Sequence, residues 1–374
     1  MTVEVERDAL LGAVRAVVDV VEARTTIPVL SNFLIEVGGG KLTLTGTDLD
    51  LQVSATIEAA GDLTTTIDAR KFQAAVDSLR PGRVTIAPME GRAAVTMKAG
   101  RGQRILPTIS AADFPKRGAM ESGSTFRLPA AQMMRMLDCT SVAMSSEETR
   151  YYLCGIYLHV ADDRLCAAAT DGHRLVRVQA DQPEGADRLT DGAILPRKAV
   201  GHLRKLLARR EGWIDVEHTS AAMAVSMGGI RMLMKLIDGT FPDYSRIIPD
   251  HVGRGFTGRP GAISETVGAV TAVTSPEGEK MKVRAVTLGI VEAPGECQAR
   301  AKDQVGTSAE EVLDVEPIGE PITFGVNRDY LKSLVTLFDE SGALTIDIRD
   351  PASPIRMSGE KDPDLVAIVM PMRV

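Results

Sequence analysis

Apolar residues recur at helical spacing in three short segments, which cover residues 68–79, 195–207 and 326–338. In the first and third segments, four apolar residues stand at positions i, i+3, i+4 and i+7 and therefore share one face of a helix. Successive segments begin roughly 130 residues apart, as expected for an internal repeat. The apolar residues are Phe72, Ala75, Val76 and Leu79 in the first segment and Leu331, Leu334, Val335 and Phe338 in the third.

A second amphipathic helix is predicted before each of these segments, over residues 5–21, 128–142 and 263–273. The stretches between the two helices alternate apolar with polar residues and carry Gly, Asp and Asn at turns, which is typical of antiparallel strands and hairpins. Two of these stretches share a Thr-Asp pair, at Thr47-Asp48 and at Thr170-Asp171.

The chain is therefore predicted to be an α+β protein with three copies of one unit, each with two helices packed on antiparallel sheet. We place the boundaries near residues 120 and 251, which predicts domains over residues 1–120, 121–251 and 252–374. Three unrelated domains with chance similarities are the alternative. The recurrence of helices, hairpins and spacing in the same order favours the repeat.

The C-terminal segment Val366–Val374 stays apolar to its last residue and contains a single Arg. Chain ends are usually polar, because little holds them in place. The segment is interpreted as a last strand that completes the third sheet, as an apolar docking surface, or as both. Met370 and Met372 fit the second interpretation, since methionine-rich surfaces suit the binding of several partners.

The overall composition is that of an ordinary globular protein, with 44% hydrophobic and 25% charged residues and a net charge of -7. No apolar run approaches the ~18 residues of a transmembrane helix. The N-terminal residues lack the basic and apolar regions of a signal peptide. The four cysteines show no C-x-x-C spacing, so we expect reduced thiols, a cytoplasmic location and no membrane association.

Positive charge nevertheless gathers in the second of the three helical segments. Arg197 and Lys198 each have a second basic residue seven positions further on, close to two helical turns, so both pairs lie on the face opposite the apolar one. Basic residues at matching places in the other two segments indicate one positive surface, although a solvated helix face is the simpler alternative. The residues are Arg197, Lys198, Arg204, Lys205, Arg209 and Arg210, with Arg70, Lys71, Arg328 and Lys332 in the other segments.

The best candidate for catalysis is the motif A-T-D-G-H-R-L-V, in which Asp171 and His173 stand two residues apart. A general base needs an orienting acid and a nearby nucleophile. The chain has no G-x-S-x-G, no H-E-x-x-H and no P-loop motif, and its five histidines are scattered. We therefore expect no catalytic residue, no metal site and no cofactor, and keep an enzyme that uses Asp171 and His173 as the alternative.

Eight motifs follow one another in the order T-G-T-D-L-D-L at Thr45, A-R-K-F at Ala69, A-D-F-P at Ala112, R-Y-Y-L at Arg150, A-T-D-G-H-R-L at Ala169, P-R-K at Pro196, F-P-D-Y at Phe241 and M-P-M-R at Met370. Together they resemble the bacterial DNA polymerase III beta subunit, the sliding clamp family, over the whole chain. The resemblance implies a homodimer that closes head to tail into a ring of six domains, with twelve helices around the hole. It also implies a non-catalytic processivity factor that encircles double-stranded DNA near the nucleoid.

The resemblance assigns site residues as well. DNA contacts would come from Arg24, Arg70, Lys198, Arg246, Tyr151 and Tyr152. A pocket for linear motifs of the DNA polymerase III alpha subunit, the clamp-loader delta subunit, other polymerases and repair proteins would be formed by Arg150, Leu153, Thr170, Gly172, His173, Arg174, Leu175, Pro242, Ile247, Val369, Met370, Pro371, Met372 and Arg373. The dimer interface would include Ile105, Leu106 and Val273.

Two departures from the family pattern affect these assignments. Glu147 and Glu148 stand where some relatives place an amide that holds DNA, and two carboxylates there would repel phosphate. Arg104 and Thr274 replace apolar residues of the expected interface. A second clamp copy specialised for repair or drug tolerance is the alternative within the family.

Overall fold

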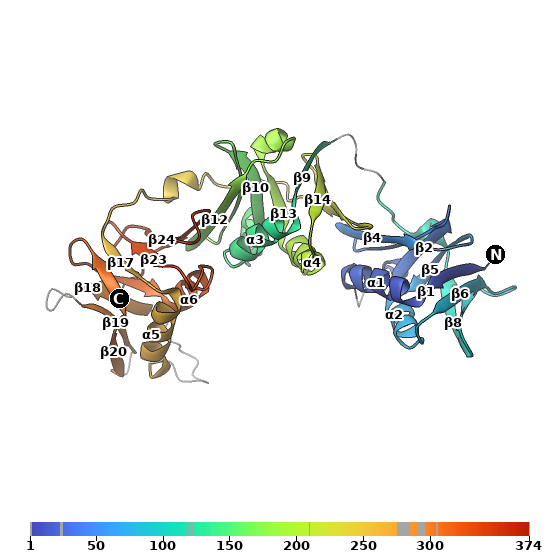
Figure 1. Ribbon diagram of the computed structural model, residues 1–374, viewed down its shortest axis with the longest axis horizontal. Coiled ribbons are helices and arrows are strands. Elements are labelled where there is room, and N and C mark those ends of the chain that lie inside the picture. The colour runs from blue at the N-terminus through green and yellow to red at the C-terminus, as the bar shows by residue number, and fades with distance from the viewer. Residues whose placement is uncertain are drawn as a thin grey trace. The chain divides into compact units, whose positions relative to one another are not determined.

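The computed structural model describes residues 2–22, 25–118, 120, 123–208, 210–274, 285–290, 296–303 and 306–373. The chain forms two compact units (Figure 1). Unit 1 contains Met1–Met134, Pro183–Arg188 and Lys198–Leu236, and unit 2 contains Arg135–Gln182, Leu189–Arg197 and Ile237–Val374. The division passes through the second repeat, and the three domains proposed from the sequence remain a prediction.

Every predicted helix is present among the described residues, and each begins directly after a strand or, for α5 (Pro260–Ala272), one residue later. The prediction over residues 5–21 was wrong at both ends, because Val5 and Glu6 continue a strand and Val18–Val20 form a separate 3-10 helix. At the start of α2 (Ala69–Asp77) a polar side chain caps the helix: Asp68 accepts a hydrogen bond from the Lys71 N–H at 2.8 Å. The helices are α1 Arg7–Val17, α2 Ala69–Asp77, α3 Ala130–Ser141, α4 Arg197–Leu207, α5 Pro260–Ala272 and α6 Arg328–Val335.

Unit 1 is built on a twelve-stranded sheet in the order β1-β6-β7-β8-β5-β2-β3-β4-β16-β15-β14-β9. Strands of the first and second repeats join where β4 pairs antiparallel with β16, in a register that places Ala55 opposite Ile230. The strands are β1 Val3–Glu6, β2 Asn32–Gly38, β3 Lys41–Thr47, β4 Leu51–Glu58, β5 Leu63–Asp68, β6 Arg83–Pro88, β7 Ala94–Ala99, β8 Gly102–Ile109, β9 Ser124–Pro129, β14 Trp213–His218, β15 Ala222–Met227 and β16 Ile230–Lys235.

Unit 2 is built on a nine-stranded sheet in the order β13-β10-β11-β12-β25-β24-β23-β17-β21 and a four-stranded sheet in the order β20-β19-β18-β22. The strands are β10 Gly155–Ala161, β11 Arg164–Thr170, β12 Arg174–Asp181, β13 Ala193–Pro196, β17 Gly255–Gly258, β18 Ala285–Ile290, β19 Cys297–Lys302, β20 Ser308–Val312, β21 Val315–Ile318, β22 Thr323–Asn327, β23 Leu344–Asp347, β24 Ile355–Gly359 and β25 Leu365–Val369.

The apolar C-terminal segment is a strand, as one of its two interpretations predicted. Strand β25 lies between β12 of the second repeat and β24 of the third, so Leu175 faces Ile368 across one ladder. All five residues of β25 are buried. The end of the chain therefore connects two repeats, which explains why it stays apolar: a strand covered on both edges and both faces has little contact with water.

The apolar face of each helix packs on a sheet, as the periodicity predicted (Figure 1). In the first repeat, Leu10, Val14 and Val17 of α1 are fully buried, and the rings of Phe33 and Phe72 pack edge to face with their centres 6.2 Å apart. Burying side chains of this size stabilises the fold by about 1.5–3 kcal/mol each. Within the described residues, no helix combines the length and apolarity needed to span a bilayer.

All four cysteines are free, as expected from their spacing, and Cys139, Cys166 and Cys297 are buried. Burial raises the pKa of Cys139 and of Cys297 to about 11, so their thiols stay protonated at neutral pH. Among the residues that the structure describes, no cluster of His, Cys, Asp and Glu is arranged to hold a metal ion.

Candidate functional site

A pocket of about 580 Å³ opens in unit 2 beside the turn that joins β11 to β12. Three further segments complete its wall: the residues after the 3-10 helix Ser245–Ile247, the turn between β23 and β24, and the end of β25. The pocket is lined by Thr170, Gly172, His173, Arg174, Leu175, Arg246, Ile247, Ile248, Pro249, Asp250, Arg349, Ser353, Pro354, Ile368 and Met370.

The turn between β11 and β12 is held by its own side chains. One oxygen of Asp171 accepts hydrogen bonds from the backbone N–H groups of His173 at 2.9 Å and Arg174 at 3.0 Å. The Thr170 hydroxyl donates to the carbonyl oxygen of Arg174 at 2.7 Å. Asp and Thr favour such turns because their short side chains reach the backbone a few residues further on.

Gly172 gives this turn its shape, because its φ of +89° lies in the left-handed region. A Cβ atom at this position would stand 2.8 Å from a guanidinium nitrogen of Arg150. Glycine therefore satisfies the backbone and leaves room for Arg150 beside the turn.

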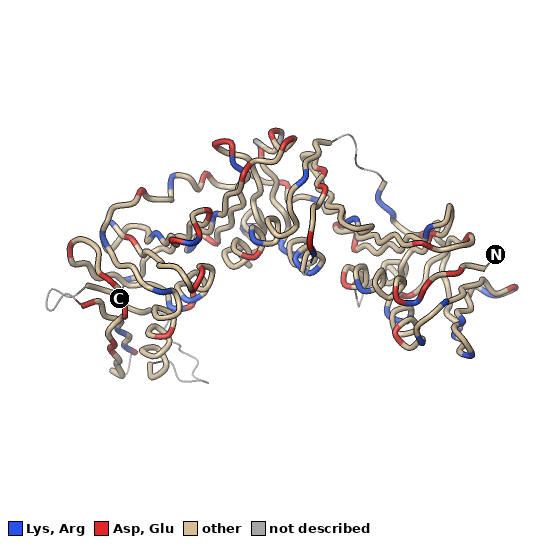
Figure 2. The backbone as a smooth tube through the Cα atoms, viewed as in Figure 1, with Lys and Arg blue, Asp and Glu red and all other residues tan. Residues whose placement is uncertain are grey.

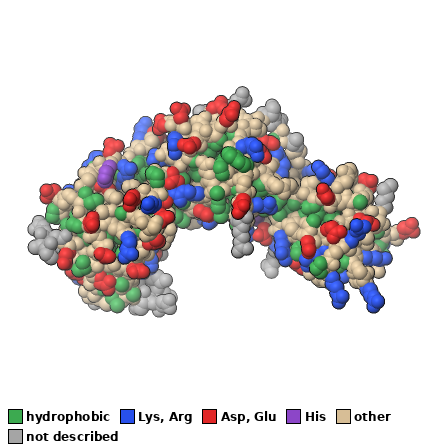
Figure 3. Space-filling view, in the orientation of Figure 1, with side chains coloured by type: hydrophobic (Ala, Val, Ile, Leu, Met, Phe, Trp, Pro, Cys, Tyr) green, Lys and Arg blue, Asp and Glu red, His purple; other side chains and the backbone are tan. Residues whose placement is uncertain are grey.

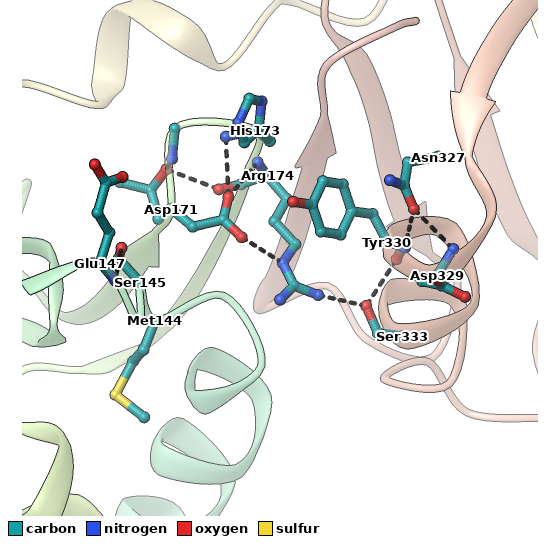
Figure 4. Close-up of polar contacts among 12 residues, drawn as sticks. Met144, Ser145, Glu147, Asp171, His173, Arg174, Asn327, Asp329, Tyr330 and Ser333 are labelled. Carbon is teal, nitrogen blue, oxygen red and sulfur yellow. Dashed lines mark hydrogen bonds and ion pairs between the residues drawn. The ribbon is translucent and has the colours of Figure 1, made fainter. Parts of the chain in front are cut away.

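Arg174 connects the turn to helix α6 of the third repeat (Figure 4). Its guanidinium donates to the second oxygen of Asp171 at 3.0 Å and to the hydroxyl of Ser333 at 2.7 Å. The same group lies 4.6 Å from the centre of the Tyr330 ring, and the His173 ring stacks on that ring at 6.0 Å. Arg174 thus makes an ion pair, a hydrogen bond and a cation–π contact at once.

Helix α6 begins at this contact with a polar cap. The side chain of Asn327 accepts hydrogen bonds from the N–H groups of Asp329 at 2.9 Å and Tyr330 at 3.2 Å. The cap fixes the first turn of α6, which carries Tyr330 toward His173 and Arg174 (Figure 4). Sequence reasoning identified this helix but missed Tyr330 and Ser333 as neighbours of the pocket.

The same geometry bears on the alternative of catalysis by Asp171 and His173. The Asp171 carboxylate is engaged by the turn backbone and by Arg174, and its hydrogen bond to His173 goes to the backbone N–H. The imidazole ring lies on Tyr330 instead. This arrangement differs from a carboxylate that orients a histidine base.

The end of the chain is attached to the pocket by its backbone. The N–H of Met370 donates to the carbonyl of His173 at 2.8 Å, and the N–H of Met372 donates to the carbonyl of Gly325 at 2.8 Å. Both methionines remain partly exposed, at 36% for Met370 and 38% for Met372. The segment therefore combines a buried strand with two exposed methionines.

The structure gathers half of the predicted pocket residues around this cavity. Leu153 lies instead in a buried cluster with Leu175 and Ile368, and Val369 is fully buried in β25. The predicted residues that line the cavity are Thr170, Gly172, His173, Arg174, Leu175, Ile247 and Met370; those that do not are Arg150, Leu153, Pro242, Val369, Pro371, Met372 and Arg373.

Several lining residues were not predicted. Ile248, Pro249 and Asp250 follow the F-P-D-Y motif, and their proximity to it was the available signal. Arg349 and Pro354 come from the β23–β24 turn, where the sequence offered no comparable signal. Arg246, expected to contact DNA, also lines the pocket and pairs with Asp243 at 2.8 Å.

Of the other predicted DNA contacts, Arg24 lies outside the described residues. Arg70 is exposed on α2. The rings of Tyr151 and Tyr152 pack edge to face with their centres 5.7 Å apart, and Tyr151 is half exposed. Lys198 is exposed at the start of α4 but pairs with two carboxylates. Arg209 also falls outside the described residues.

The predicted positive surface needs a correction on α4. Figure 2 shows basic residues along this helix, but carboxylates lie against them, and Lys205 pairs with Asp19 at 2.8 Å. Arg197 is directed to backbone and donates to the carbonyl of Met144 at 2.8 Å. On the face seen in Figure 3, basic and acidic side chains are interspersed.

The expected repulsion at the loop before Arg150 is partly offset. Glu147 accepts hydrogen bonds from the Arg150 guanidinium, which lower the pKa of Glu147 below its usual value. One of the two carboxylates in this loop is therefore compensated by a neighbouring cation.

The residues assigned to a dimer interface differ in exposure. Ile105 on β8 and Val273 after α5 are large apolar side chains that stand about half exposed, whereas Leu106 is buried. The Arg104 guanidinium donates to the backbone carbonyl of Ser78 at 3.0 Å. Exposed apolar side chains of this size are consistent with an interface, which remains a prediction.

Known proteins resemble this chain over its whole length. A family model of the DNA polymerase III beta subunit, N-terminal domain, matches residues 1–118, and one of its central domain matches residues 127–243. Curated beta sliding clamps from Caulobacter vibrioides and from Escherichia coli strain K12 are 32% and 30% identical, each with 100% of both chains covered.

The chain belongs to the bacterial beta sliding clamp family. Two solved clamps agree in structure: that of Bartonella birtlesii bound to griselimycin, with a TM-score of 0.91, and pol III beta of Caulobacter crescentus, with a TM-score of 0.92. Both are 32% identical in sequence and cover 100% of either chain. These matches confirm the prediction of helices packed on antiparallel sheets and the clamp fold that the family resemblance implied.

Proposed function

We propose that two copies of this sliding clamp join head to tail into a homodimeric ring that encircles double-stranded DNA and performs no chemistry itself. The observation that carries the proposal is the likeness to beta sliding clamps over the full length, in sequence and in structure. Ile105 and Val273 support the dimer, because each exposes a large apolar side chain in the first or the third repeat.

Arg70, Lys198 and Arg246, with Arg24, would contact phosphates of the enclosed duplex, while the rings of Tyr151 and Tyr152 would stack on bases. Phosphate contacts carry no sequence information and weaken as salt rises. Aromatic stacking is likewise tolerant of sequence. Such contacts suit a ring that stays on DNA by topology and must move along it.

The pocket would bind linear motifs of the DNA polymerase III alpha subunit, the clamp-loader delta subunit, other polymerases and repair proteins, in the cytoplasm at the replisome. Ile247 and Met370 support this role, because they bring partly exposed apolar side chains to a cavity that also holds Arg174 and His173. Apolar anchors with a few polar groups are the usual composition of a peptide site. The relative from Bartonella birtlesii was solved with a bound ligand, griselimycin.

Retention on circular and linearised DNA tests the ring. The clamp is loaded onto nicked plasmid circles with a clamp loader, and half of the sample is then cut once. If the protein stays on the circular DNA but dissociates from the cut DNA, it is topologically linked to the circle. Equal loss from both forms would contradict the proposal, and so would an open monomer at cellular concentration.

A further inference from the structure

The pocket turn has a counterpart in unit 1. In the turn between β3 and β4, Thr47 donates to the carbonyl of Leu51 at 3.0 Å, as Thr170 does to Arg174. One oxygen of Asp48 accepts hydrogen bonds from the N–H groups of Asp50 at 3.0 Å and Leu51 at 2.7 Å. The two Thr-Asp turns are therefore built by the same bonds.

The likeness extends to the neighbouring strand and the backbone angles. The N–H of Lys235, at the end of β16, donates to the carbonyl of Asp50 at 2.9 Å, as that of Met370 does to His173. Leu49 has a φ of +83°, close to that of Gly172. Position by position, the first turn repeats the scaffold of the pocket turn.

The two turns differ in what the second aspartate oxygen holds. In unit 2 this oxygen of Asp171 accepts from Arg174 in the same turn. In unit 1 the corresponding oxygen of Asp48 accepts from the ammonium group of Lys198 at 2.5 Å. The side chain of Asp48 is 4% exposed and that of Lys198 50%, so a nearly buried carboxylate holds a lysine at the surface.

Two more carboxylates hold lysines of α4. Lys198 also pairs with Glu22 at 3.1 Å, and Lys205 pairs with Asp19 at 2.8 Å. The hydrogen bond from Lys205 lowers the pKa of Asp19. Burial opposes the charge of Lys198, but its bonds to Asp48 and Glu22 outweigh that effect and raise its pKa.

We propose that Asp19, Glu22 and Asp48 limit the affinity of the clamp for DNA. They hold Lys198 and Lys205 in ion pairs, which a phosphate of the duplex has to displace before it can bind either lysine. This inference rests on the proposed encirclement of DNA. A lysine that exchanges between a fixed carboxylate and passing phosphates binds each phosphate weakly. The ring then stays mobile while its topology prevents escape.

The inference has a measurable consequence in salt dependence. A lysine already paired with a carboxylate contributes less to phosphate binding, because one ion pair is exchanged for another. Each lysine released to a phosphate adds about 0.9 to the slope of log K against log salt for duplex DNA. Exposed pairs of this kind are weak, so each is expected to change the affinity about two- to fivefold.

The test measures duplex binding by fluorescence anisotropy between 20 and about 200 mM salt, the range in which phosphate contacts are resolved. The full-length clamp is compared with its Glu22→Gln and Asp19→Asn variants. The matched control is Glu4→Gln, which makes the same change of charge at a carboxylate that pairs with Arg83 on neighbouring strands at 3.1 Å. We expect the first two variants to bind about two- to fivefold more tightly at low salt with steeper slopes, and the control to match wild type.

A double-mutant cycle separates release of the lysine from a general gain of positive charge. In a Lys198→Gln background, Glu22→Gln should no longer tighten binding, because the lysine that Glu22 helps to hold is missing. An undiminished effect there, or equal effects of Glu22→Gln and Glu4→Gln, would overturn the inference.

Retention of wild type on circles, measured in parallel, distinguishes this outcome from failure of the proposed function. Unchanged affinity and slope in the variants of a clamp that stays on circles would refute the inference alone. Loss of wild type from circles as fast as from linear DNA would refute encirclement and the inference with it.

Discussion

The backbone N–H of Met370 donates a hydrogen bond to the carbonyl of His173 at 2.8 Å, so the end of the chain is attached to the turn that shapes the pocket. Ile368, two residues earlier, is buried opposite Leu175. The chain thus passes from core to pocket wall within three residues. Truncation of the C-terminal residues can therefore remove this part of the pocket wall and leave the strands of the sheet in place.

Deletion of residues 370–374 is expected to abolish binding of peptides with polymerase-derived clamp motifs, because Met370, which lines the cavity, is lost. Strand β25 ends at Val369, and its ladders to β12 and β24 remain. Circular dichroism and sedimentation should therefore report an intact homodimer. Full peptide affinity in the truncated protein would contradict the pocket assignment.

Gly172→Ala is expected to destabilise the protein by about 1–2 kcal/mol, because alanine does not tolerate a φ of +89°. It should also weaken peptide binding, since the new methyl group would displace Arg150. Leu49 at the equivalent place has the same unfavourable angle, so Leu49→Gly should be neutral or stabilising by up to about 1 kcal/mol. Urea denaturation measures both effects.

Gly201 provides the control for these glycine changes. It lies within α4, and a Cβ atom there would meet no atom within 4 Å. Gly201→Ala should stabilise the protein by about 0.5–1 kcal/mol through helix propensity. A stabilising Gly172→Ala would show that the positive φ of the turn is not required.

Arg174→Ala is expected to lower the free energy of unfolding by about 2–3 kcal/mol, because it leaves the nearly buried Asp171 without its cation. Arg174→Lys should recover only part of this loss, since an ammonium cannot serve Asp171, Ser333 and Tyr330 together. Arg246→Ala, which breaks an exposed pair with Asp243, is the matched control and should not change the urea midpoint. Equal effects of the two alanine variants would argue against a structural role for Arg174.

His159 should make the stability of the protein depend on pH. Burial lowers the pKa of His159 to about 4, while the unfolded value is about 6.5. The folded state favours the neutral ring, so the contribution is present above pH 6.5 and is lost as the pH falls toward 4. The loss should approach about 3 kcal/mol across this window, at about 1.4 kcal/mol per pH unit.

The matched variant is His159→Gln, which can still bond to the Tyr244 hydroxyl, a 3.0 Å contact in the native protein, but does not titrate. Urea denaturation between pH 4.5 and about 7 should show a shallower decline for this variant than for wild type. Parallel declines would assign the acid sensitivity to other groups.

The predicted helices were confirmed because their signal is local. Phe72, Ala75 and Val76 share a face through spacing alone, and that face is buried in the structure. The ends were less well predicted: Val5 belongs equally to a helical pattern and to a strand, and pairing with Val84 on β6 decided for the strand.

The turn of the pocket is likewise set by residues that are close together in the sequence. Thr170 and Asp171 carry short polar side chains that bond to the backbone of a tight turn, and Gly172 adopts its positive φ. In the sequence, the Thr-Asp pair shared by Thr47-Asp48 and Thr170-Asp171 is only a sign of the repeat; the structure shows that both pairs form turns with the same hydrogen bonds.

The sequence by itself determined the repeated unit, the helices with their apolar faces, the turn residues and the apolar character of the chain end. Tertiary structure decided which distant groups meet: Tyr330 and Ser333 at Arg174, Arg349 at the pocket, and Asp48 at Lys198. Periodicity and turn chemistry depend on neighbours a few residues apart, so a linear sequence displays them. Ion pairs and pocket walls depend on how strands align. That alignment brings together side chains that are far apart along the chain, so no local sequence pattern shows which of them meet.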